Sequence, residues 1–494
     1  MKIGGLDIGT TGCKLTIFTA AGEYLDKAYC GYPVKRQKEG HEIDVTAIMD
    51  SVFQVIDQMS KKFPDILGIG VTSLGETFVM TDSDGMPLHP AMLYTDPRGK
   101  AECAELVDAL GERKIANITG VRPSEVYSIS KMMWIKKHRP EIYDAAKHIF
   151  LMEDYVVFRL TGKTQIDYSL ASRTMAFDIR TLEWSEDIFE VAGIDSALMS
   201  RPVPTGTDAG VLTQEVAALT GLADNARIIS VSHDQIAAAI GAGAFDAEIL
   251  ADGAGTTECL TPIFNDMPDM EVMNRGHFSV APYVIPNKYV AYAFSNTSGA
   301  LMEWCSSMLA KKEAEFAGDE NISVNEYLER NSTSPTGLLV LPHFAGAGTP
   351  YMDTGSKGAI IGLTTETTVA DIYRGCMEGV AYEMYLNMLA LKDAGVHFTK
   401  VHATGGGARS SEWMQMKADV WNVPIVAFEM SDAGTVGSAM LTGIAIGIFA
   451  NLDEAAKQMV EIRETFYPRE EMHEKYMELF KSYRQLYEAV RPLV

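Results

Sequence analysis

Residues 5–18 read GLDIGTTGCKLTIF, and a related stretch, DGAGTTECLTPIF, occupies residues 252–264. In both, a strand-like run leads into a Gly-Thr-Thr turn and a second strand-like run follows, which is typical of a β-hairpin. A Gly-rich turn lets backbone N–H groups approach phosphate oxygens, and the threonine hydroxyls add donors. One copy alone would be better explained as an ordinary glycine-containing hairpin. Two copies almost half a chain apart favour duplicated halves that each present a phosphate-binding hairpin to a shared cleft.

The first hairpin also carries charged side chains that suit a magnesium-dependent phosphate site. Lys14 adds a positive charge, whereas Asp7 would be repelled by phosphate unless a divalent cation lay between them. We therefore expect Mg²⁺ near Asp7 and phosphate groups near Thr10, Thr11 and Lys14.

Composition narrows the class of protein. The chain has 494 residues, of which 47% are hydrophobic and 22% charged, and its formal net charge is −24. The length predicts two or more domains, and the composition is typical of a soluble globular protein. The negative charge argues against general affinity for nucleic acid or an anionic membrane. Because the chain shows no long apolar segment and no secretion signal, we expect a cytoplasmic protein with reduced cysteines.

Several rival catalytic motifs are missing. The sequence TGKT at residues 161–164 resembles the end of a P-loop, but Val157 stands where that motif needs a glycine. The chain contains no G-x-G-x-x-G, H-E-x-x-H or G-x-S-x-G motif, which argues against a dinucleotide fold, a zinc protease and a serine hydrolase.

A third Gly-rich stretch, VHATGGGARSSEWMQMKADVWNVPI at residues 401–425, predicts a strand, a triple-glycine loop and a helix from about Ser411 to Val420. Three glycines would let the loop lie flat against an adenine ring, and the helix N-terminus offers free N–H donors. The same pattern is also compatible with a simple strand-to-helix turn.

Over nearly the whole chain, these stretches resemble the FGGY family of carbohydrate kinases, in the actin-like ATPase superfamily. LDIGTTGCK (6–14) resembles its first phosphate motif, GAGTTE (253–258) its second, and GGGARSSEWMQMKAD (405–419) its adenosine motif. Four further stretches follow the family's order: YSISKMMWIKKH (127–138), EDYVVFRLTGKTQIDYSLASRT (153–174), VSHDQIAAAIGAGA (231–244) and GAIIGLTTETTVADIYRGCMEGVAYE (358–383). An ordered series is far more specific than any single motif.

The resemblance implies an α/β fold of two ribonuclease-H-like domains with a catalytic cleft between them. Residues 1–244 would form the N-terminal domain, with the sugar site, the first phosphate motif and the catalytic aspartate. Residues 245–494 would form the C-terminal domain, with the second phosphate motif and the adenosine site. ATP and Mg²⁺ are the implied cofactors, and a homodimer is a further expectation.

The resemblance also assigns residues. Asp234, in SHDQ, matches the base that accepts the proton of the attacking sugar hydroxyl, although Asp is also a common helix N-cap. Glu76, Thr77 and Asp96 match the acceptor site, where carboxylates suit vicinal hydroxyls; His233 is interpreted as structural. Asp7 and Asp234 are the implied magnesium ligands. The implied ATP-binding residues are Thr10, Thr11, Lys14, Gly255, Thr256, Thr257, Gly405, Gly406, Gly407 and Ala408.

The acceptor remains open at this stage. A ketopentose such as xylulose is the first choice, and glycerol, erythritol or another polyol, gluconate and fuculose are alternatives. Gly75-Glu76 stands where xylulokinases have Met-His, and Gly75 stands where glycerol kinases have an arginine before their glutamate. A non-kinase, actin-like ATPase switch is the remaining alternative. Such a protein would usually add a peptide-binding domain or insertions, for which this chain leaves little room.

Overall fold

The structure is a computed structural model that describes residues 1–429 and 432–494, and the chain divides into two compact units. Unit 1 comprises Met1–Phe245, Ser279–Val290 and Asp432–Val460, and unit 2 comprises the remainder. The sequence placed all of residues 245–494 in the second domain, whereas two later segments pack within unit 1. The division of functions between the two halves stays a prediction.

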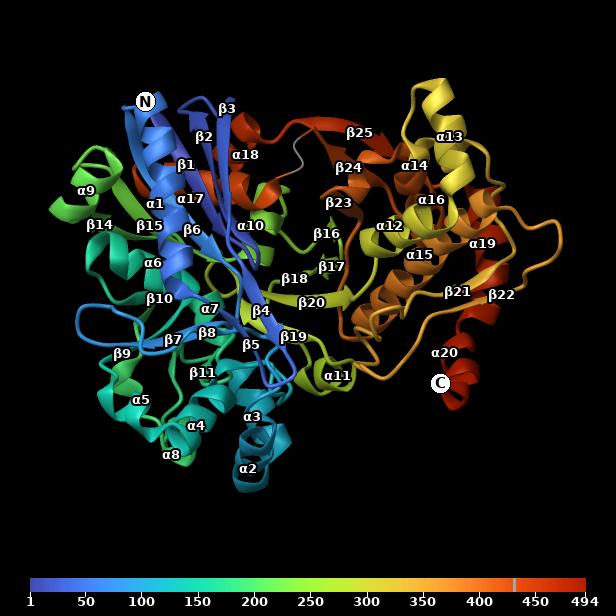
Figure 1. The fold of residues 1–494 in the computed structure, drawn as a ribbon. Helices are drawn as coiled ribbons and strands as arrows, with labels where there is room; N and C mark the ends of the chain where they lie inside the picture. Colours follow the sequence, from blue (N-terminus) through green and yellow to red (C-terminus); the bar gives the residue numbers. More distant parts are fainter. Residues whose placement is uncertain (430–431) are drawn as a thin grey trace. The chain divides into compact units, whose positions relative to one another are not determined.

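Unit 1 is built on a six-stranded sheet in the order β14-β15-β6-β1-β2-β3 (Figure 1). Its strands are β1 (Lys2–Ile8), β2 (Gly12–Thr19), β3 (Tyr24–Gly31), β6 (Ile66–Ser73), β14 (Thr207–Val211) and β15 (Arg227–His233). A five-stranded sheet contains β4 (Val34–Gln37), β5 (Gly40–Ile43), β8 (Ala91–Met92), β7 (Phe78–Thr81) and β9 (His148–Leu151). The shorter strands are β10 (Gln165–Asp167), β11 (Phe177–Asp178), β12 (Glu183–Trp184), β13 (Arg201–Val203) and β19 (Ser279–Pro282).

Helices cover both faces of the six-stranded sheet of unit 1. Its helices are α1 (Val45–Lys62), α2 (Lys100–Leu110), α3 (Glu112–Thr119), α4 (Ser128–His138), α5 (Pro140–Ala145), α6 (Met152–Thr161), α7 (Tyr168–Ser172), α8 (Glu186–Ala192), α9 (Gln214–Thr220), α10 (Asp234–Gly241), α17 (Ala433–Ala445) and α18 (Leu452–Met459). The apolar stripe of α1, including Ile48, Val52 and Val55, shares one core with Leu6 and Leu15 of the sheet. Because successive side chains of a strand point to opposite faces of a sheet, the alternate residues of these strands point away from α1.

Helix α17 lies close to the other face because that face is built from glycines. A Cβ atom on Gly5 would lie 2.1 Å from the Thr435 carbonyl oxygen, and one on Gly70 would lie 2.7 Å from that of Ser438. The hydroxyl of Ser438 donates to the Gly70 carbonyl at 2.8 Å. Small residues on both partners thus allow near contact of the two backbones, which explains why residues 432–460 belong to unit 1.

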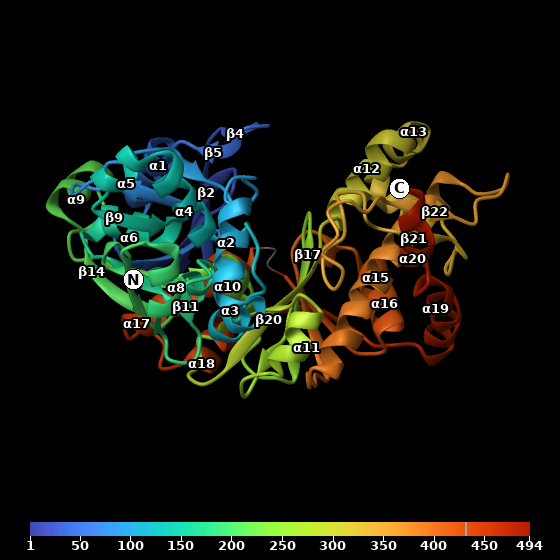
Figure 2. The ribbon, with the colours of Figure 1, turned by 90° about the horizontal axis from the view of Figure 1, so that it is seen from below.

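Unit 2 is built on a mixed sheet in the order β18-β20-β17-β16-β23-β24-β25. The strands are β16 (Ile249–Ala254), β17 (Glu258–Thr261), β18 (Ile263–Phe264), β20 (Tyr289–Ser295), β23 (Lys400–Thr404), β24 (Ile425–Phe428) and β25 (Ile462–Phe466), with β21 (Leu339–Leu341) paired to β22 (Ala359–Ile361). Its helices are α11 (Met270–Arg275), α12 (Gly299–Leu309), α13 (Lys311–Glu320), α14 (Val324–Arg330), α15 (Val369–Asp393), α16 (Ser411–Trp421), α19 (Glu470–Tyr483) and α20 (Leu486–Val490). Figure 2 shows α16 beside the long α15 in this unit.

The two Gly-Thr-Thr hairpins occupy equivalent places in the two sheets. In unit 1 the order β3-β2-β1-β6-β15 contains two antiparallel pairs followed by two parallel pairs. In unit 2 the order β20-β17-β16-β23-β24 has the same directions. The repeat in the sequence is therefore a repeat of topology, with each turn at the end of the central hairpin.

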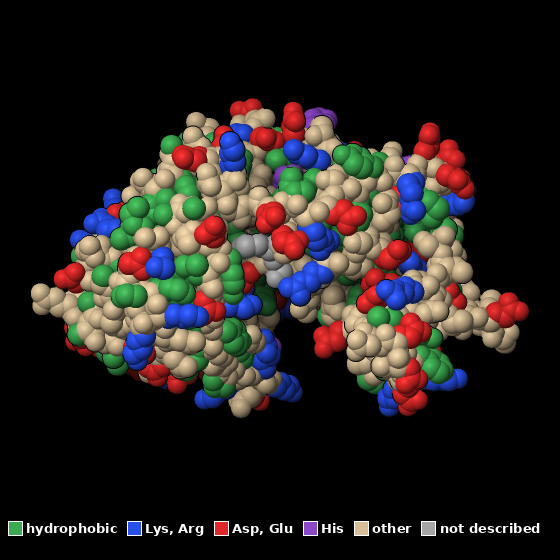
Figure 3. All heavy atoms as spheres, turned by 90° about the horizontal axis from the view of Figure 1, so that it is seen from above, with side chains coloured by type: hydrophobic (Ala, Val, Ile, Leu, Met, Phe, Trp, Pro, Cys, Tyr) green, Lys and Arg blue, Asp and Glu red, His purple; other side chains and the backbone are tan. Residues whose placement is uncertain are grey.

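The surface agrees with the acidic composition. On the face shown in Figure 3, acidic and basic side chains are interspersed, and that face shows no continuous basic area. In the part of the chain that the structure describes, no helix is both long enough and apolar enough to span a membrane.

Candidate active site

The turn of the first hairpin is held by a neighbouring segment of unit 1. The Gly9 N–H donates to the Gly12 carbonyl at 3.0 Å and closes the turn. The Tyr32 hydroxyl donates to the Gly9 carbonyl at 2.5 Å, and the Tyr32 N–H donates to the Thr11 carbonyl at 3.1 Å. Thr10 is half-buried and Thr11 is exposed. The carbonyls of Gly9 and Thr11 are thus both hydrogen-bonded to Tyr32. These bonds hold the turn that is predicted to bind phosphate.

Beside this turn, Lys14 joins two carboxylates. Its Nζ lies 3.2 Å from Asp7 Oδ2 and 2.9 Å from Asp432 Oδ1. Burial raises the pKa of Asp7, against the opposing effect of Lys14. Asp432 immediately precedes α17, and no local motif distinguished it in the sequence. The predicted phosphate-binding lysine is therefore neutralised by carboxylates in this state.

Asp234 is the first residue of α10, directly after β15. Burial raises its pKa to about 7, and the negative charges of Asp7 and Glu76 add to the effect. The His233 Nε2 lies 3.1 Å from Asp234 Oδ1. Burial also lowers the pKa of His233 well below its usual value, so the ring is neutral. The residue that caps α10 is His233, and Asp234 itself lies within the first turn. A carboxylate with this pKa can take up a proton near neutral pH.

Glu76 and Thr77 follow the end of β6 and are both buried. Glu76 Oε1 accepts a hydrogen bond from Arg173 Nε at 2.6 Å and a second from Arg173 Nη2. The Glu76 carbonyl accepts from the Ser128 hydroxyl at 2.7 Å. Thr77 is completely buried, and its N–H donates to the Gly75 carbonyl at 2.5 Å. Arg173 stands inside a quoted motif, but nothing in its local sequence announced the contact with Glu76.

Asp96 is buried and already engaged. Its Oδ1 accepts from the N–H and Nε of Arg98 at 2.9 and 2.8 Å. Its Oδ2 accepts from the His41 N–H at 2.8 Å and from Arg98 Nη2 at 2.6 Å. Burial opposes ionisation, but these bonds outweigh it and lower the pKa of Asp96. Because a carboxylate offers about four lone-pair sites, these donors occupy its whole capacity.

In unit 2 the second hairpin and the adenosine motif lie together. The carbonyls of Gly255 and Thr256 accept from the N–H groups of Gly299 and Ala300 at the start of α12, at 2.9 and 3.1 Å. Thr256 and Thr257 are exposed. A Cβ atom on Gly405, whose φ is +87°, would lie 2.6 Å from the Ala254 carbonyl at the end of β16. The triple-glycine loop thus packs directly on the hairpin.

A pocket of about 750 Å³ opens beside this loop, entirely within unit 2. Gly406, Gly407 and the start of α16 form one wall, α12 and α14 contribute others, and Tyr373 also lines it. Gly407 begins a short 3-10 turn that ends at Arg409 and includes Ala408, and the Ser410 hydroxyl caps α16 by accepting the Trp413 N–H at 3.0 Å. The size is suitable for a nucleoside, because small-ligand pockets span about 300–1,000 Å³.

A buried triad of charged side chains connects the second hairpin to α16, the helix that follows the triple-glycine loop. Lys417 Nζ lies 2.8 Å from Asp252 Oδ2 and 2.8 Å from Glu258 Oε1, and all three side chains are completely buried. Asp252 is on β16, Glu258 on β17 and Lys417 on α16. The Ser298 hydroxyl donates to the other Glu258 oxygen at 2.7 Å. This connection was not predicted, since the three residues are far apart in sequence.

The side chains of unit 1 could supply only part of the ligand set of a magnesium ion. Asp7 Oδ1 is buried and makes no hydrogen bond to the described residues, and the buried Asp234 Oδ1 has His233 Nε2 as its neighbour at 3.1 Å. Within residues 1–429 and 432–494, no three His, Cys, Asp or Glu side chains are grouped to hold a metal. Mg²⁺ commonly uses one or two carboxylates together with substrate phosphates and water, so two carboxylates are compatible with it.

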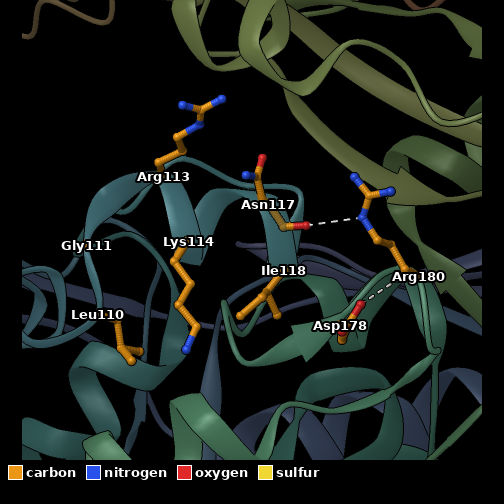
Figure 4. Close-up of a pocket in the computed structure, with 8 residues that line it drawn as sticks. All are labelled: Leu110, Gly111, Arg113, Lys114, Asn117, Ile118, Asp178 and Arg180. Atoms are coloured by element: carbon orange, nitrogen blue, oxygen red, sulfur yellow. Dashed lines mark hydrogen bonds between the residues drawn. The ribbon is translucent and has the colours of Figure 1, made fainter.

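A second hollow, which belongs to unit 1 and has a volume of about 630 Å³, lies beside α3 (Figure 4). Arg113 and Lys114 extend from α3 in opposite directions in Figure 4. The Lys114 Nζ pairs with Asp187 at 2.6 Å. The backbone N–H of Arg180 donates to the Asp178 carboxylate at 2.8 Å. Because these cations do not converge on one point, the hollow lacks the geometry of an anion site.

Comparison with known proteins decides the family. The model of the N-terminal domain of the FGGY family of carbohydrate kinases matches residues 2–241, and that of the C-terminal domain matches residues 254–446. The chain belongs to the FGGY family of carbohydrate kinases. It is therefore a sugar phosphotransferase, and kinases of this family use ATP. The family and the enzyme class predicted from the sequence are confirmed.

Individual FGGY kinases resemble the chain over its full length. It is 27% identical to the xylulose kinase of Bacillus subtilis (strain 168), covering 99% of this chain and 97% of the relative. It is 27% identical to the gluconokinase of the same organism, covering 98% and 94%. The structure of ligand-bound xylulose kinase from Lactobacillus acidophilus matches with a TM-score of 0.89 at 23% identity, covering 99% and 98%. This match confirms the two-domain α/β fold.

Proposed function

We propose that this FGGY kinase transfers the γ-phosphate of ATP, bound with Mg²⁺, to a hydroxyl of a ketopentose such as xylulose. The observation that carries the proposal is Asp234, a half-buried carboxylate whose pKa is raised to about 7 by burial and by its neighbours Asp7 and Glu76. Phosphoryl transfer needs a carboxylate that orients the attacking hydroxyl and accepts its proton. The full-length similarity to xylulose kinases supports the choice of a ketopentose.

Unit 1 would hold the acceptor and unit 2 the adenosine, and the hairpins of both units would donate to the phosphates. In unit 1, Asp234 accepts the proton of the hydroxyl while Glu76 receives hydrogen bonds from neighbouring hydroxyls. Thr77, next to Glu76, and Asp96, which binds Arg98 and His41, would position the segments of the acceptor site. The first turn, with Thr10, Thr11 and Lys14, would donate to the phosphates. Magnesium, held by Asp7 and Asp234, would neutralise the phosphate charge and so favour transfer. In unit 2, Gly255, Thr256 and Thr257 would donate to the phosphates, and residues 405–408 would line the adenosine site.

An acceptor screen tests this proposal. ADP release should be measured for the purified protein with ketopentoses, polyols, deoxysugars and gluconate, with and without Mg²⁺. We expect release that depends on one of the neutral ketoses and that disappears when the metal is chelated. Release only with a non-carbohydrate acceptor, or the same release without any acceptor, would contradict the proposed reaction.

A further inference from the structure

Glu76 and Arg173 form a buried ion pair in the predicted acceptor site of unit 1. The Glu76 side chain is 7% exposed and that of Arg173 is 12% exposed. The guanidinium lies over the Tyr127 ring, 5.2 Å from its centroid. In such a partly desolvated place, opposite charges interact more strongly than at the surface, and removing one partner leaves the other uncompensated.

Gly75 provides the space that Arg173 occupies. A Cβ atom at residue 75 would lie 3.1 Å from Arg173 Cγ and 3.2 Å from Cδ2 and Nε2 of His233. These contacts are tighter than ordinary van der Waals distances, so even a β-carbon here would require Arg173 and His233 to shift by a few tenths of an ångström. The positive charge beside Glu76 thus comes from residue 173, on a separate segment, and not from the residue that precedes the glutamate.

Glu76 is fixed in one orientation. Its φ is +56°, a region that non-glycine residues adopt rarely and at an energetic cost, and such strain concentrates at functional sites. Its carbonyl is held by Ser128. Two of the three guanidinium nitrogens, Nε and Nη2, bind the same oxygen, Oε1. The geometry therefore leaves Oε2 to receive hydrogen bonds from an acceptor.

The other cations around this region are engaged as well. The Lys131 ammonium donates to the carbonyls of Glu125 and Val126 at 2.5 and 2.6 Å. Arg98 is bound by Asp96 and by Glu42 at 2.6 and 2.7 Å. Lys14, on the first hairpin, is shared by two carboxylates. Arg98 and Lys14 are therefore paired with carboxylates, and the Lys131 ammonium is held by two backbone carbonyls.

We propose that the Glu76–Arg173 pair selects the charge of the acceptor, so that the site takes a neutral polyhydroxy compound and rejects an aldonate. An aldonate carboxylate would face Glu76 and Asp234, and it would meet a guanidinium whose Nε and Nη2 are already bound to Glu76. Like charges brought together in a desolvated site are strongly unfavourable. This inference rests on the proposed kinase function, and it assigns gluconate as a poor substrate.

The test compares a neutral acceptor with gluconate in three proteins: the wild type, a single variant and a double variant. The measured quantity is the ratio of kcat/KM for gluconate to kcat/KM for the best neutral acceptor. We expect a ratio below about 0.1 in the wild type. Glu76→Gln releases the charge of Arg173 and should raise the ratio at least about tenfold. Adding Arg173→Gln to this variant removes the released charge and should abolish the gain.

A matched pair elsewhere in unit 1 provides the control. Arg227 Nε donates to Asp208 Oδ2 at 2.8 Å, the same kind of contact on the outer strands of the sheet. Asp208→Asn should therefore leave the acceptor ratio unchanged. The melting temperature of each variant, measured with and without ADP, shows whether it is folded.

Two outcomes overturn the inference: a wild-type enzyme that prefers gluconate, or a ratio that stays constant in Glu76→Gln. Calorimetric titration with the same two acceptors makes the comparison without turnover. Binding of the neutral compound with no phosphorylation would count against the proposed reaction and support the charge selection. Phosphorylation of gluconate in preference to all neutral acceptors would leave the kinase proposal intact and refute the charge selection.

Discussion

Two aspartates of unit 1 show how surroundings decide the chemistry of a residue. Asp96 accepts four hydrogen bonds, its pKa is lowered, and it ties the segment of Arg98 to His41. Asp234 lies next to other carboxylates, and its pKa is raised to about 7. The first is a permanently charged anchor, whereas the second can exchange a proton at neutral pH.

Asp234→Asn should separate these roles. The amide cannot accept the proton of the hydroxyl, so we expect turnover to fall by about 10²–10⁴-fold. Affinity for ADP without the metal should change little, because the substitution keeps the size of the side chain and removes only the charge that is proposed to hold magnesium. Steady-state kinetics and ADP titration measure the two quantities. Asp96→Asn is the comparison: it should mainly lower the melting temperature, because it weakens the bonds to Arg98 and His41. Near-normal turnover of the folded Asp234→Asn protein would exclude this residue as the base.

At the residue scale, the sequence identified side chains within recognisable local patterns. The Gly-Thr-Thr turns, Asp234 and the glycine loop each lie in a short motif. Arg173 contacts Glu76 across 97 positions, and Lys417 contacts Asp252 across 165. Such contacts depend on how segments meet in three dimensions. Nothing next to Arg173 in the sequence indicates its partner, so no local pattern could have predicted it.

At the scale of the elements, the triad of Lys417, Asp252 and Glu258 joins α16 to both strands of the second hairpin. Buried ion pairs are expensive to desolvate, and apolar residues are often equally stabilising in their place. The triad is therefore better understood as a device that fixes the position of the hairpin relative to the adenosine loop. The hairpins could be predicted from the sequence, but their attachment to α16 could not.

Glu153 of α6 and Asp167, the last residue of β10 and the N-cap of α7, are buried carboxyl groups whose protonation affects stability. Burial raises the pKa of Asp167 to about 6 and that of Glu153 well above its usual value. Both groups bind their protons more tightly in the folded state. The stability that Asp167 contributes is therefore fully present below about pH 4 and lost as the pH rises through about 6, and Glu153 acts in the same direction.

We accordingly expect the melting temperature to be lower at pH 8 than at pH 5. For Asp167 alone, the change between pH 5 and pH 8 corresponds to roughly 1.4 kcal/mol of unfolding free energy. Glu153→Gln, which carries no titratable proton, should flatten the profile. Glu23→Gln, at an exposed site, is the matched control and should follow the wild type. A profile that is equally steep in Glu153→Gln would show that this carboxyl group does not cause the dependence.

At the scale of the whole molecule, the sequence located two related halves but not the three-segment construction of unit 1. The shared strand order accounts for the two hairpins. The return of residues 432–460 depends on backbone contacts at Gly5 and Gly70, which look like ordinary strand glycines in the sequence. Their role, which is to allow the close approach of α17, becomes clear only from the structure.

Residues 1–244 expressed alone should fail to form a stable domain. Without α17, the glycine-rich face of the six-stranded sheet and the small residues of α10 lose their cover. Circular dichroism during heating should show no cooperative transition. Joining residues 432–460 to residue 245 through a flexible linker should restore one. Cooperative unfolding of the 1–244 fragment would mean that α17 is dispensable for this unit.

The same three-segment construction sets an order of events during protein synthesis. The ribosome makes the six-stranded sheet of unit 1 first, yet the helix that closes it follows about 200 residues later. At roughly 5–20 residues per second, this delay is about 10–40 s. During that interval the sheet has one open face while unit 2 is still being made. The glycine-rich face of the sheet therefore stays uncovered until α17, which lies within the last eighth of the chain, has emerged.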